Sequence, residues 1–243
     1  KKNLKIRICV DYRKLNKVTE RDHFPLPFTD QVLETVAGHE MYSFMDGFSG
    51  YNQLEIHPDD QLKTTFSTPW GTFAYRVVPF GLTNAPSFFH RAMLRIFYDF
   101  HHKFLEIFMD DFTTFSKQME HLARLERIFT RCREFGLCLN PEKCIFCVTS
   151  GRLLGHIVSK EGITTDPDKI KYMLQMKTPK NEHDVRSFMG MANYYNTHID
   201  KLAYAAGPLY LLMRKDNDFQ WMEDQDKAFK DIKKRCTATP ILS

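Results

Sequence analysis

Three aspartates stand at the ends of short apolar segments, where carboxylates could bind metal. Phe108 and Met109 lead directly into Asp110 and Asp111, and the apolar segment 42–45 ends at Asp46. Burying a carboxylate costs several kcal/mol unless it is paired or metal-bound. Mg²⁺ in proteins is held by one or two carboxylates plus substrate phosphates, and two ions about 3.5–4 Å apart serve in-line phosphoryl transfer. The pattern is typical of that chemistry; a set of unrelated strand-end acids is the alternative.

The aspartates can meet only if particular elements carry them. Residues 104–115 are apolar and Thr-rich, interrupted only by Glu106 and the acidic pair, which predicts two short strands with the acids at the tip. Strand side chains alternate between faces, so we expect one of Asp110 and Asp111 to face the site more directly. We expect Asp46 and Asp110 side by side at one end of the sheet. An Asp-Asp pair at a tip is also common in solvated turns.

A glycine-bearing loop, residues 79–86, precedes a predicted helix. Its sequence is Pro-Phe-Gly-Leu-Thr-Asn-Ala-Pro, in which Asn84 suits the helix N-cap and Pro86 the first turn. Such a loop can bring backbone close to a ligand, and a helix N-terminus favours anions. An ordinary capped turn is equally compatible with the pattern.

Other segments predict a mixed chain of strands and helices. We expect strands or hairpins over 6–10, 66–78, 137–139 and 152–159. A helix over 31–36 would be capped by Asp30 and ended by Gly38. The amphipathic helix predicted over 119–135 would bury Leu122, Leu125, Ile128, Phe129, Cys132 and Phe135. Helical periods dominate after Asp166, with Asn181 as an N-cap, which predicts a domain boundary near residue 160.

The composition is that of a folded protein with a weak net charge. Of 243 residues, 43% are hydrophobic and 26% charged, so the chain can bury a core and is not disordered. The 34 Lys and Arg against 30 Asp and Glu give a net charge of +4, which permits nucleic-acid binding without indicating it. No apolar run approaches the roughly 18 residues of a membrane span, so we expect no membrane partner.

The cysteines and the first residue bear on the protein's context. Cys144 and Cys147 have zinc-ligand spacing, and Cys138 and His156 could complete a site, but a single such pair favours reduced thiols in an intracellular protein. The chain begins at Lys1 without an initiator Met or a signal-peptide pattern. We therefore expect a fragment of a longer protein.

Six segments, in this order, carry a resemblance to a known family. They are 9–16 (CVDYRKLN), 44–51 (FMDGFSGY), 79–86 (PFGLTNAP), 108–111 (FMDD), 139–144 (LNPEKC) and 153–156 (LLGH). The chain resembles, along almost its whole length, the reverse transcriptase of gypsy-type LTR retrotransposons. In these elements the reverse transcriptase is part of a Pol polyprotein. The resemblance implies an α+β right-hand polymerase fold: fingers and palm in residues 1–160, helical thumb in 161–215, and in 216–243 a connector toward a ribonuclease H domain outside this chain.

The resemblance also assigns roles to single residues. Asp46, Asp110 and Asp111 would bind two Mg²⁺ or Mn²⁺ ions, and Lys143 would protonate the leaving pyrophosphate. The implied nucleotide-binding residues are Arg7, Gly47, Phe48, Tyr51, Phe80 and Gly81, with Tyr51 excluding a 2′-hydroxyl. The implied primer and template contacts are Met109, Leu154, Gly155, His156, Arg186 and Asn193. Taken without the resemblance, Lys143 could be a surface lysine, Tyr51 a core residue and Arg186 a helix-surface charge.

The implied function is that of an RNA-directed DNA polymerase, a nucleotidyltransferase that adds deoxynucleotides to a primer on an RNA or DNA template. Its covalent partners would be ribonuclease H, integrase and protease domains, and its location a cytoplasmic particle or the nucleus. A decayed or domesticated element that binds nucleic acid without catalysis is the alternative, against which all three carboxylates and Lys143 are intact. An RNA-templated RNA polymerase would share the metal chemistry, but Tyr51 argues against it.

Overall fold

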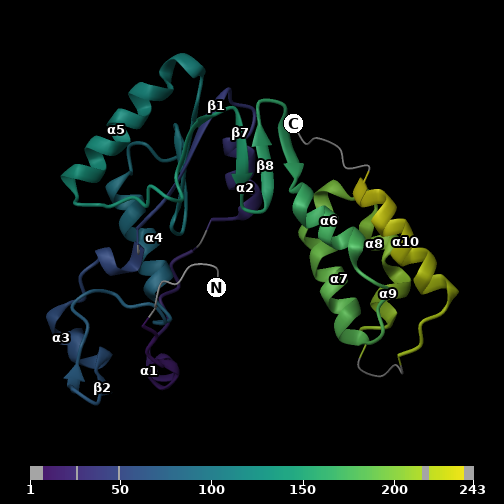
Figure 1. The fold of residues 1–243 in the computed structure, drawn as a ribbon, viewed down its shortest axis with the longest axis horizontal. Helices are drawn as coiled ribbons and strands as arrows, with labels where there is room; N and C mark the ends of the chain where they lie inside the picture. The colour runs from purple at the N-terminus through teal and green to yellow at the C-terminus, as the bar shows by residue number, and fades with distance from the viewer. Residues whose placement is uncertain (1–7, 26, 49, 215–218, 238–243) are drawn as a thin grey trace. The chain divides into compact units, whose positions relative to one another are not determined.

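The chain forms two compact units, which divide between residues 149 and 150 (Figure 1). The computed structural model describes residues 8–25, 27–48, 50–214 and 219–237. The division lies ten residues before the boundary expected near residue 160. The reason is that the hairpin over 150–159 makes hydrogen bonds to a helix of the second unit, through Tyr194 and Tyr195.

A four-stranded antiparallel sheet is the centre of the first unit. Its strands, in the order β4-β5-β1-β6, are β1 (Met41–Asp46), β4 (Leu105–Phe108), β5 (Asp111–Ser116) and β6 (Ile145–Val148). A separate hairpin is formed by β2 (Phe66–Thr68) and β3 (Gly71–Phe73). The helices are α1 (Arg13–Val18), α2 (Thr29–Val36), α3 (Pro58–Gln61), α4 (Ala85–Ile96) and α5 (His121–Glu134), with 3-10 turns η1 (Gly50–Gln53), η2 (Leu62–Thr64) and η3 (Gln118–Glu120). The predicted hairpin over 104–115 is confirmed, and the one predicted over 66–78 is present but ends at residue 73.

Strand alternation decides what packs on each face of this sheet. Met45 and its register partner Phe112 point into a core shared with α4 and α5. Tyr42 and Phe44 stack on each other and belong to the opposite face. Helix α2 contacts β4 and β5 outside the α4–α5 core, and Figure 1 shows α2 and α5 on either side of β1.

Helix α5 lies within the helix predicted over 119–135, but its first buried residue is His121 and not Leu122. The buried residues are His121, Leu125, Ile128 and Cys132, a stripe with spacings of four, three and four residues. Leu122 and Phe135, expected on the same face, are 71% and 56% exposed. Leu122 lies beside the stripe, because His121 takes the buried position of the first turn, and Phe135 lies beyond the last turn.

His121 is the centre of a buried hydrogen-bond network. Its Nε2 lies 2.8 Å from Ser43 Oγ on β1, and its Nδ1 lies 2.7 Å from Ser116 Oγ on β5. The backbone N–H of Cys147 donates to Ser43 Oγ at 3.0 Å, which extends the network to β6. All three side chains are buried. The network therefore joins α5 to three strands of the sheet.

Replacing His121 by Ala should destabilise the fold more at neutral than at acid pH. Burial, and then the charge of Arg124, lower the pKa of His121 below its ordinary value. The unfolded state therefore binds more protons, so the stabilisation is complete above about pH 6.5 and is lost as pH falls through the lower folded-state pKa. We expect His121→Ala to lower the free energy of unfolding by about 2–4 kcal/mol at pH 7.5 and by less at pH 5.5, in urea unfolding. His57→Ala, an exposed site, is the control; equal costs at both pH values would contradict the network.

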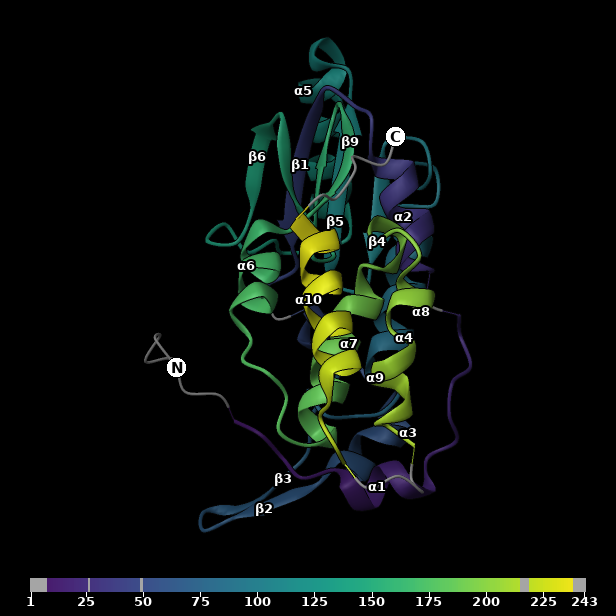
Figure 2. The same cartoon turned by 90° about the vertical axis from the view of Figure 1, so that its right-hand side faces the viewer.

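The second unit combines a small sheet with a helical bundle. Its strands, antiparallel in chain order, are β7 (Ser150–Leu153), β8 (His156–Ser159) and β9 (Gly162–Thr165). Its helices are α6 (Pro167–Gln175), α7 (Glu182–Tyr194), α8 (Leu202–Ala205), α9 (Gly207–Leu211) and α10 (Glu223–Thr237), with the 3-10 turn η4 (Asn196–His198) (Figure 2). Asn181 caps α7 as predicted, its Oδ1 accepting from the Asp184 N–H at 2.9 Å. None of the helices in the described ranges is both long and apolar enough to cross a membrane.

Several local predictions are wrong. Residues 8–10 form no strand, and the rest of that predicted strand lies outside the described residues. Residues 137–139 contribute only an isolated bridge, between Leu139 and Gly47. Helix α2 begins at Thr29, one residue before Asp30, which therefore lies in its first turn and caps nothing.

Candidate active site

The sheet register brings two of the three aspartates directly opposite each other. Asp46, the last residue of β1, pairs with Asp111, the first residue of β5. Direct partners in an antiparallel pair share one face, so both carboxylates point the same way. Asp110 lies in the turn, where its carbonyl accepts from the Gly47 N–H at 3.3 Å. Asp111 is therefore the direct register partner of Asp46, and Asp110 lies in the turn at the same end of the sheet.

The turn that carries Asp110 has an unusual backbone. Phe108 pairs with Asp111, so Met109 and Asp110 form a two-residue loop, and Met109 has a φ of 56°. Hairpin turns with positive φ at the first position favour glycine there, because a side chain is strained. This conformation takes Asp110 out of the strand alternation. A Cβ added to Gly50 would lie 3.7 Å from the Asp110 Cβ, so Asp110 lies over the start of η1.

Lys143 joins the aspartates from a distant part of the chain. Its Nζ lies 2.8 Å from Asp46 Oδ2. The loop before it is held by the Asn140 N–H, which donates to the Asp46 carbonyl at 2.8 Å. Lys143 is therefore no isolated surface lysine: it neutralises one member of the acidic group while half of its side chain stays exposed.

The carboxylates influence one another's protonation. The pKa of Asp111 is raised to about 6, first by the protein atoms that replace water around it and then by the charges of Asp110 and Asp46, with Lys143 opposing them. Part of Asp111 remains open to solvent, which screens these charges. The pKa of Tyr51 is raised by burial and then by Asp110, so its hydroxyl lies within electrostatic reach of the same group. The site carries more negative charge than Lys143 balances.

The donor chemistry of this group fits a divalent cation. Carboxylate oxygens are the ligands of Mg²⁺, and a cation would relieve the repulsion that raises the pKa of Asp111. The carboxylate oxygens of the three aspartates do not all lie within 4.8 Å of one another. Within the described ranges, the only three His, Cys, Asp or Glu side chains with ligand atoms all within 4.8 Å are His101, His102 and Glu106. The cysteines expected to be reduced thiols are free and form no such group in that part of the chain.

Tyr51 lies in η1 beside the aspartates, half-buried between two aromatic rings. Its ring meets Phe80 edge-on at 5.2 Å between centroids and Phe89 at 5.6 Å. Phe80 is half-exposed, as is Phe48 just before η1. Tyr51 therefore packs on the core residue Phe89 of α4 on one side and on Phe80 on the other. The Phe80 ring is itself partly exposed to solvent.

The glycine-bearing loop is shaped by side chains that the sequence did not indicate. Gly81 has a φ of 101°, which favours glycine. The Asn16 amide donates to the Gly81 carbonyl at 2.8 Å and accepts from the Thr83 N–H at 2.9 Å. Asn84 makes no side-chain cap; its amide instead bonds the backbone of Glu20 and Asp22. The loop is therefore tied to residues 16–22, and Asn84 occupies the predicted N-cap position without making a side-chain cap bond.

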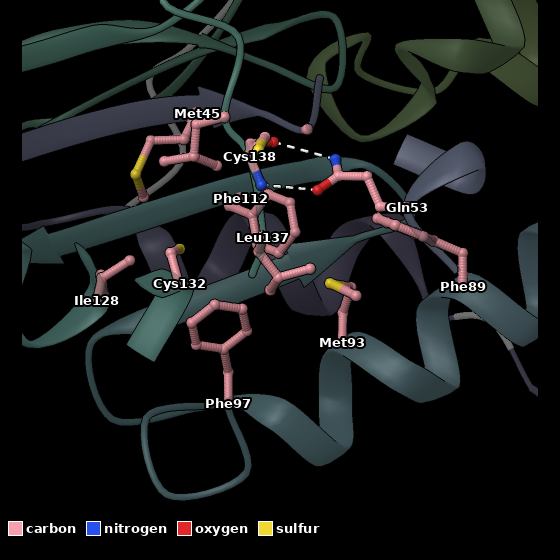
Figure 3. Close-up of a pocket in the computed structure, with 12 residues that line it drawn as sticks. Met45, Gln53, Phe89, Met93, Phe97, Phe112, Ile128, Cys132, Leu137 and Cys138 are labelled. Carbon is pink, nitrogen blue, oxygen red and sulfur yellow. Dashed lines mark hydrogen bonds between the residues drawn. The ribbon is translucent and has the colours of Figure 1, made fainter. Parts of the chain in front are cut away.

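Gln53, which no motif in the sequence indicated, holds residue 138 in place. At the end of η1, its amide donates to the Cys138 carbonyl at 3.0 Å and accepts from the Cys138 N–H at 2.6 Å (Figure 3). The same nitrogen donates to the Phe48 carbonyl at 2.7 Å. The Gln53 amide thus satisfies both backbone hydrogen bonds of residue 138, as a neighbouring strand would. The same side chain lines a small, mostly apolar pocket under β1 and β5.

In the second unit, the predicted primer residues form a tight turn between β7 and β8. Leu154 and Gly155 both have positive φ, 45° and 70°, as in a type I′ hairpin. The Tyr194 hydroxyl donates to the Leu154 carbonyl, and the Tyr195 hydroxyl to the Gly155 carbonyl at 2.8 Å. His156 is buried against these tyrosines. The turn is thus held by helix α7, which explains how a leucine keeps a left-handed backbone.

The two remaining predicted contacts on α7 are engaged within their own unit. Arg186 bonds to Glu182 and donates to the Met213 carbonyl at 2.9 Å. Asn193 accepts from the Tyr210 hydroxyl at 3.0 Å. Arg7, the expected triphosphate-binding arginine, lies outside the described residues. The structure therefore brings together Asp46, Asp110, Asp111, Lys143 and Tyr51 in one unit.

Known proteins match this chain along its whole length. A family model described as "Reverse transcriptase (RNA-dependent DNA polymerase)" matches residues 1–172. The retrovirus-related Pol polyprotein from transposon 297 of Drosophila melanogaster is 34% identical over 241 residues, which cover 98% of this chain and 23% of the polyprotein. The transposon Tf2-3 polyprotein of Schizosaccharomyces pombe is 30% identical over 243 residues, 100% of this chain and 18% of the polyprotein. The chain thus spans less than a quarter of the length of these curated relatives.

Solved structures show the same fold. A foamy viral protease-reverse transcriptase in complex with double-stranded DNA has a TM-score of 0.90 at 19% identity, covering 98% of this chain and 42% of that chain. Its counterpart in complex with an RNA/DNA hybrid has a TM-score of 0.86 at 19% identity, covering 98% and 32%. These matches confirm the expected polymerase fold, and the transposon polyproteins confirm the resemblance to retrotransposons. With its acidic group at the end of β1 and β5 and the family model matching residues 1–172, this chain belongs to the reverse transcriptase family.

Proposed function

We propose that this chain catalyses RNA-directed DNA synthesis, adding deoxynucleotides to a primer 3′-hydroxyl. The observation that carries the proposal is the pairing of Asp46 with Asp111 at the end of the sheet, with Asp110 in the adjoining turn and Lys143 on Asp46. The related foamy viral enzymes were solved with double-stranded DNA and an RNA/DNA hybrid, which supports a primer–template duplex as the ligand of this chain.

The acidic residues and Lys143 would divide the chemistry between them. Asp46, Asp110 and Asp111 would hold two Mg²⁺ or Mn²⁺ ions, which when bound supply charge neutralisation for phosphoryl transfer. Lys143, a cation at the edge of the acidic group, would donate a proton to the departing pyrophosphate. Holding the primer end and the α-phosphate in line supplies the rest of the rate enhancement.

The surrounding residues would bind the substrates. Tyr51 would lie under the incoming sugar, and the nucleotide would also contact Gly47, Phe48, Phe80 and Gly81. The primer and template would meet Met109, the turn of Leu154 and Gly155, His156, and α7 through Arg186 and Asn193, once these exchange their present partners. Residues 1–160 would serve as fingers and palm, 161–215 as thumb and 216–243 as a connector. Linked ribonuclease H, integrase and protease domains, and an intracellular particle or the nucleus, complete the proposal.

Primer extension tests the proposed function directly. With a poly(rA) template, an oligo(dT) primer and dTTP, the purified chain should incorporate dTMP only when Mg²⁺ or Mn²⁺ is present, because the acidic group needs a cation to approach phosphate. Failure to extend the primer while still binding the duplex, with no tightening of dTTP binding by metal, would favour a non-catalytic nucleic-acid-binding element.

A further inference from the structure

A second group of metal-ligating side chains lies in the turn between α4 and β4. His101 Nε2 lies 3.3 Å from one oxygen of the Glu106 carboxylate, and His102 Nδ1 lies 2.7 Å from the other. The ligand atoms of all three residues lie within 4.8 Å of one another. This His-His-Glu group takes no part in the proposed polymerase chemistry.

The backbone builds this group from adjacent residues. His102 has a φ of 60°, a left-handed conformation that is uncommon outside glycine, and its N–H donates to the Leu105 carbonyl at 3.2 Å. The resulting tight turn places the His101 and His102 rings 3.7 Å apart between centroids, both directed at one carboxylate. The two imidazoles are therefore held in place before any ligand arrives.

Glu106 supplies the negative charge of this group and is its most deeply buried member. It is 2% exposed and lies on β4 between Leu105 and Ile107, which are fully buried. A carboxylate in such surroundings needs a counter-charge or a metal. Its ion-pair partners within the described ranges are these two imidazoles.

We propose that His101, His102 and Glu106 bind one Zn²⁺ ion, with water as the fourth ligand. Imidazole and carboxylate hold Zn²⁺ at about 2.0–2.2 Å, which in a tetrahedral site sets ligand atoms about 3.3 Å apart. One ligand atom from each of the three residues already lies within 4.8 Å of the other two, so small side-chain rotations admit the ion. The His102 side chain is 70% exposed, which leaves a path for the ion and room for water.

The zinc site is separate from the three aspartates. Glu106 precedes Asp110 by four residues, about 13 Å along an extended strand. Imidazole ligands select zinc and similar transition metals, whereas Mg²⁺ requires oxygen ligands. A bound Zn²⁺ would fasten the end of α4 to β4, the strand that leads into the hairpin carrying Asp110 and Asp111.

Zinc titration of the whole 243-residue chain tests the proposal. In calorimetry with excess Mg²⁺ present, the wild type should bind one equivalent of Zn²⁺, and its melting temperature should rise with zinc. His102→Ala and Glu106→Gln should each weaken that binding at least tenfold. His57→Ala is a matched control, because His57 is also 70% exposed and lies 3.6 Å from one carboxylate, that of Asp59. It should bind zinc as the wild type does.

The outcomes are distinct. Zinc binding by His102→Ala as tight as that of the wild type, or no zinc binding by the wild type, overturns the proposal. The exposed His102 can be replaced without loss of the fold, which circular dichroism and the zinc-free melting temperature would check. A second readout is the visible absorption of Co²⁺ bound in place of zinc: it should appear in the wild type and in His57→Ala, and be absent in His102→Ala.

Discussion

Replacing Asp110 by Asn is expected to lower the rate of primer extension by at least about a thousandfold, or about 4 kcal/mol of transition-state stabilisation. The amide keeps the shape of the side chain but removes the negative charge at the tip of the hairpin, where it lies beside Gly50 and Asp111. A cation that approaches phosphate then loses one of its charged oxygens. Single-turnover incorporation of dTMP measures the loss.

The matched control is Asp59→Asn, because Asp59 lies in the short helix α3 and its side chain is exposed. It should extend primers at the wild-type rate, and circular dichroism should show both variants folded. Equal incorporation by the wild type and Asp110→Asn would exclude Asp110 from the metal-binding group.

Replacing Tyr51 by Ala should make the enzyme accept ribonucleotides. The ring is braced edge-on between Phe80 and Phe89, so it cannot easily move aside for a 2′-hydroxyl. We expect the ratio of kcat/KM for dTTP to that for UTP to fall by at least about a hundredfold, which corresponds to about 2.7 kcal/mol of discrimination. The ratio is the proper readout, because loss of the ring also loosens packing on Phe89 and lowers both rates together.

Tyr51→Phe separates the ring from the hydroxyl. It keeps both aromatic contacts, so it should discriminate as the wild type does. If Tyr51→Ala still excludes ribonucleotides, the steric role of Tyr51 is wrong and the ring only completes the core of α4.

The parts of the site that follow local rules could be predicted from the sequence. Apolar strands ending in acid, with a turn between two of them, predicted the hairpin and the meeting of Asp46 with its partners. Which aspartate stands opposite Asp46 depends on the register between β1 and β5, two strands far apart in the chain, and the sequence did not indicate that register.

Contacts between distant residues could not be predicted from spacing. The ion pair of Lys143 with Asp46 spans 97 residues, and the bridge from Gln53 to Cys138 spans 85. Asn84 fitted a local cap, but the backbone of residues 20–22 offered its amide other partners. Tertiary contacts decide such choices, because a polar side chain can satisfy its hydrogen bonds in several ways.

The Gln53 bridge connects Tyr51, the proposed sugar contact, with Lys143, the proposed proton donor. Gln53 ends the 3-10 turn that holds Tyr51, and its amide grips residue 138, from which the chain runs through Asn140 to Lys143. A ribose that displaces Tyr51 would shift residues 138–143 through Gln53. The Lys143 ammonium group would then move away from the Asp46 carboxylate. A wrong nucleotide would then be penalised twice, in how tightly it is held and in how fast it reacts once held.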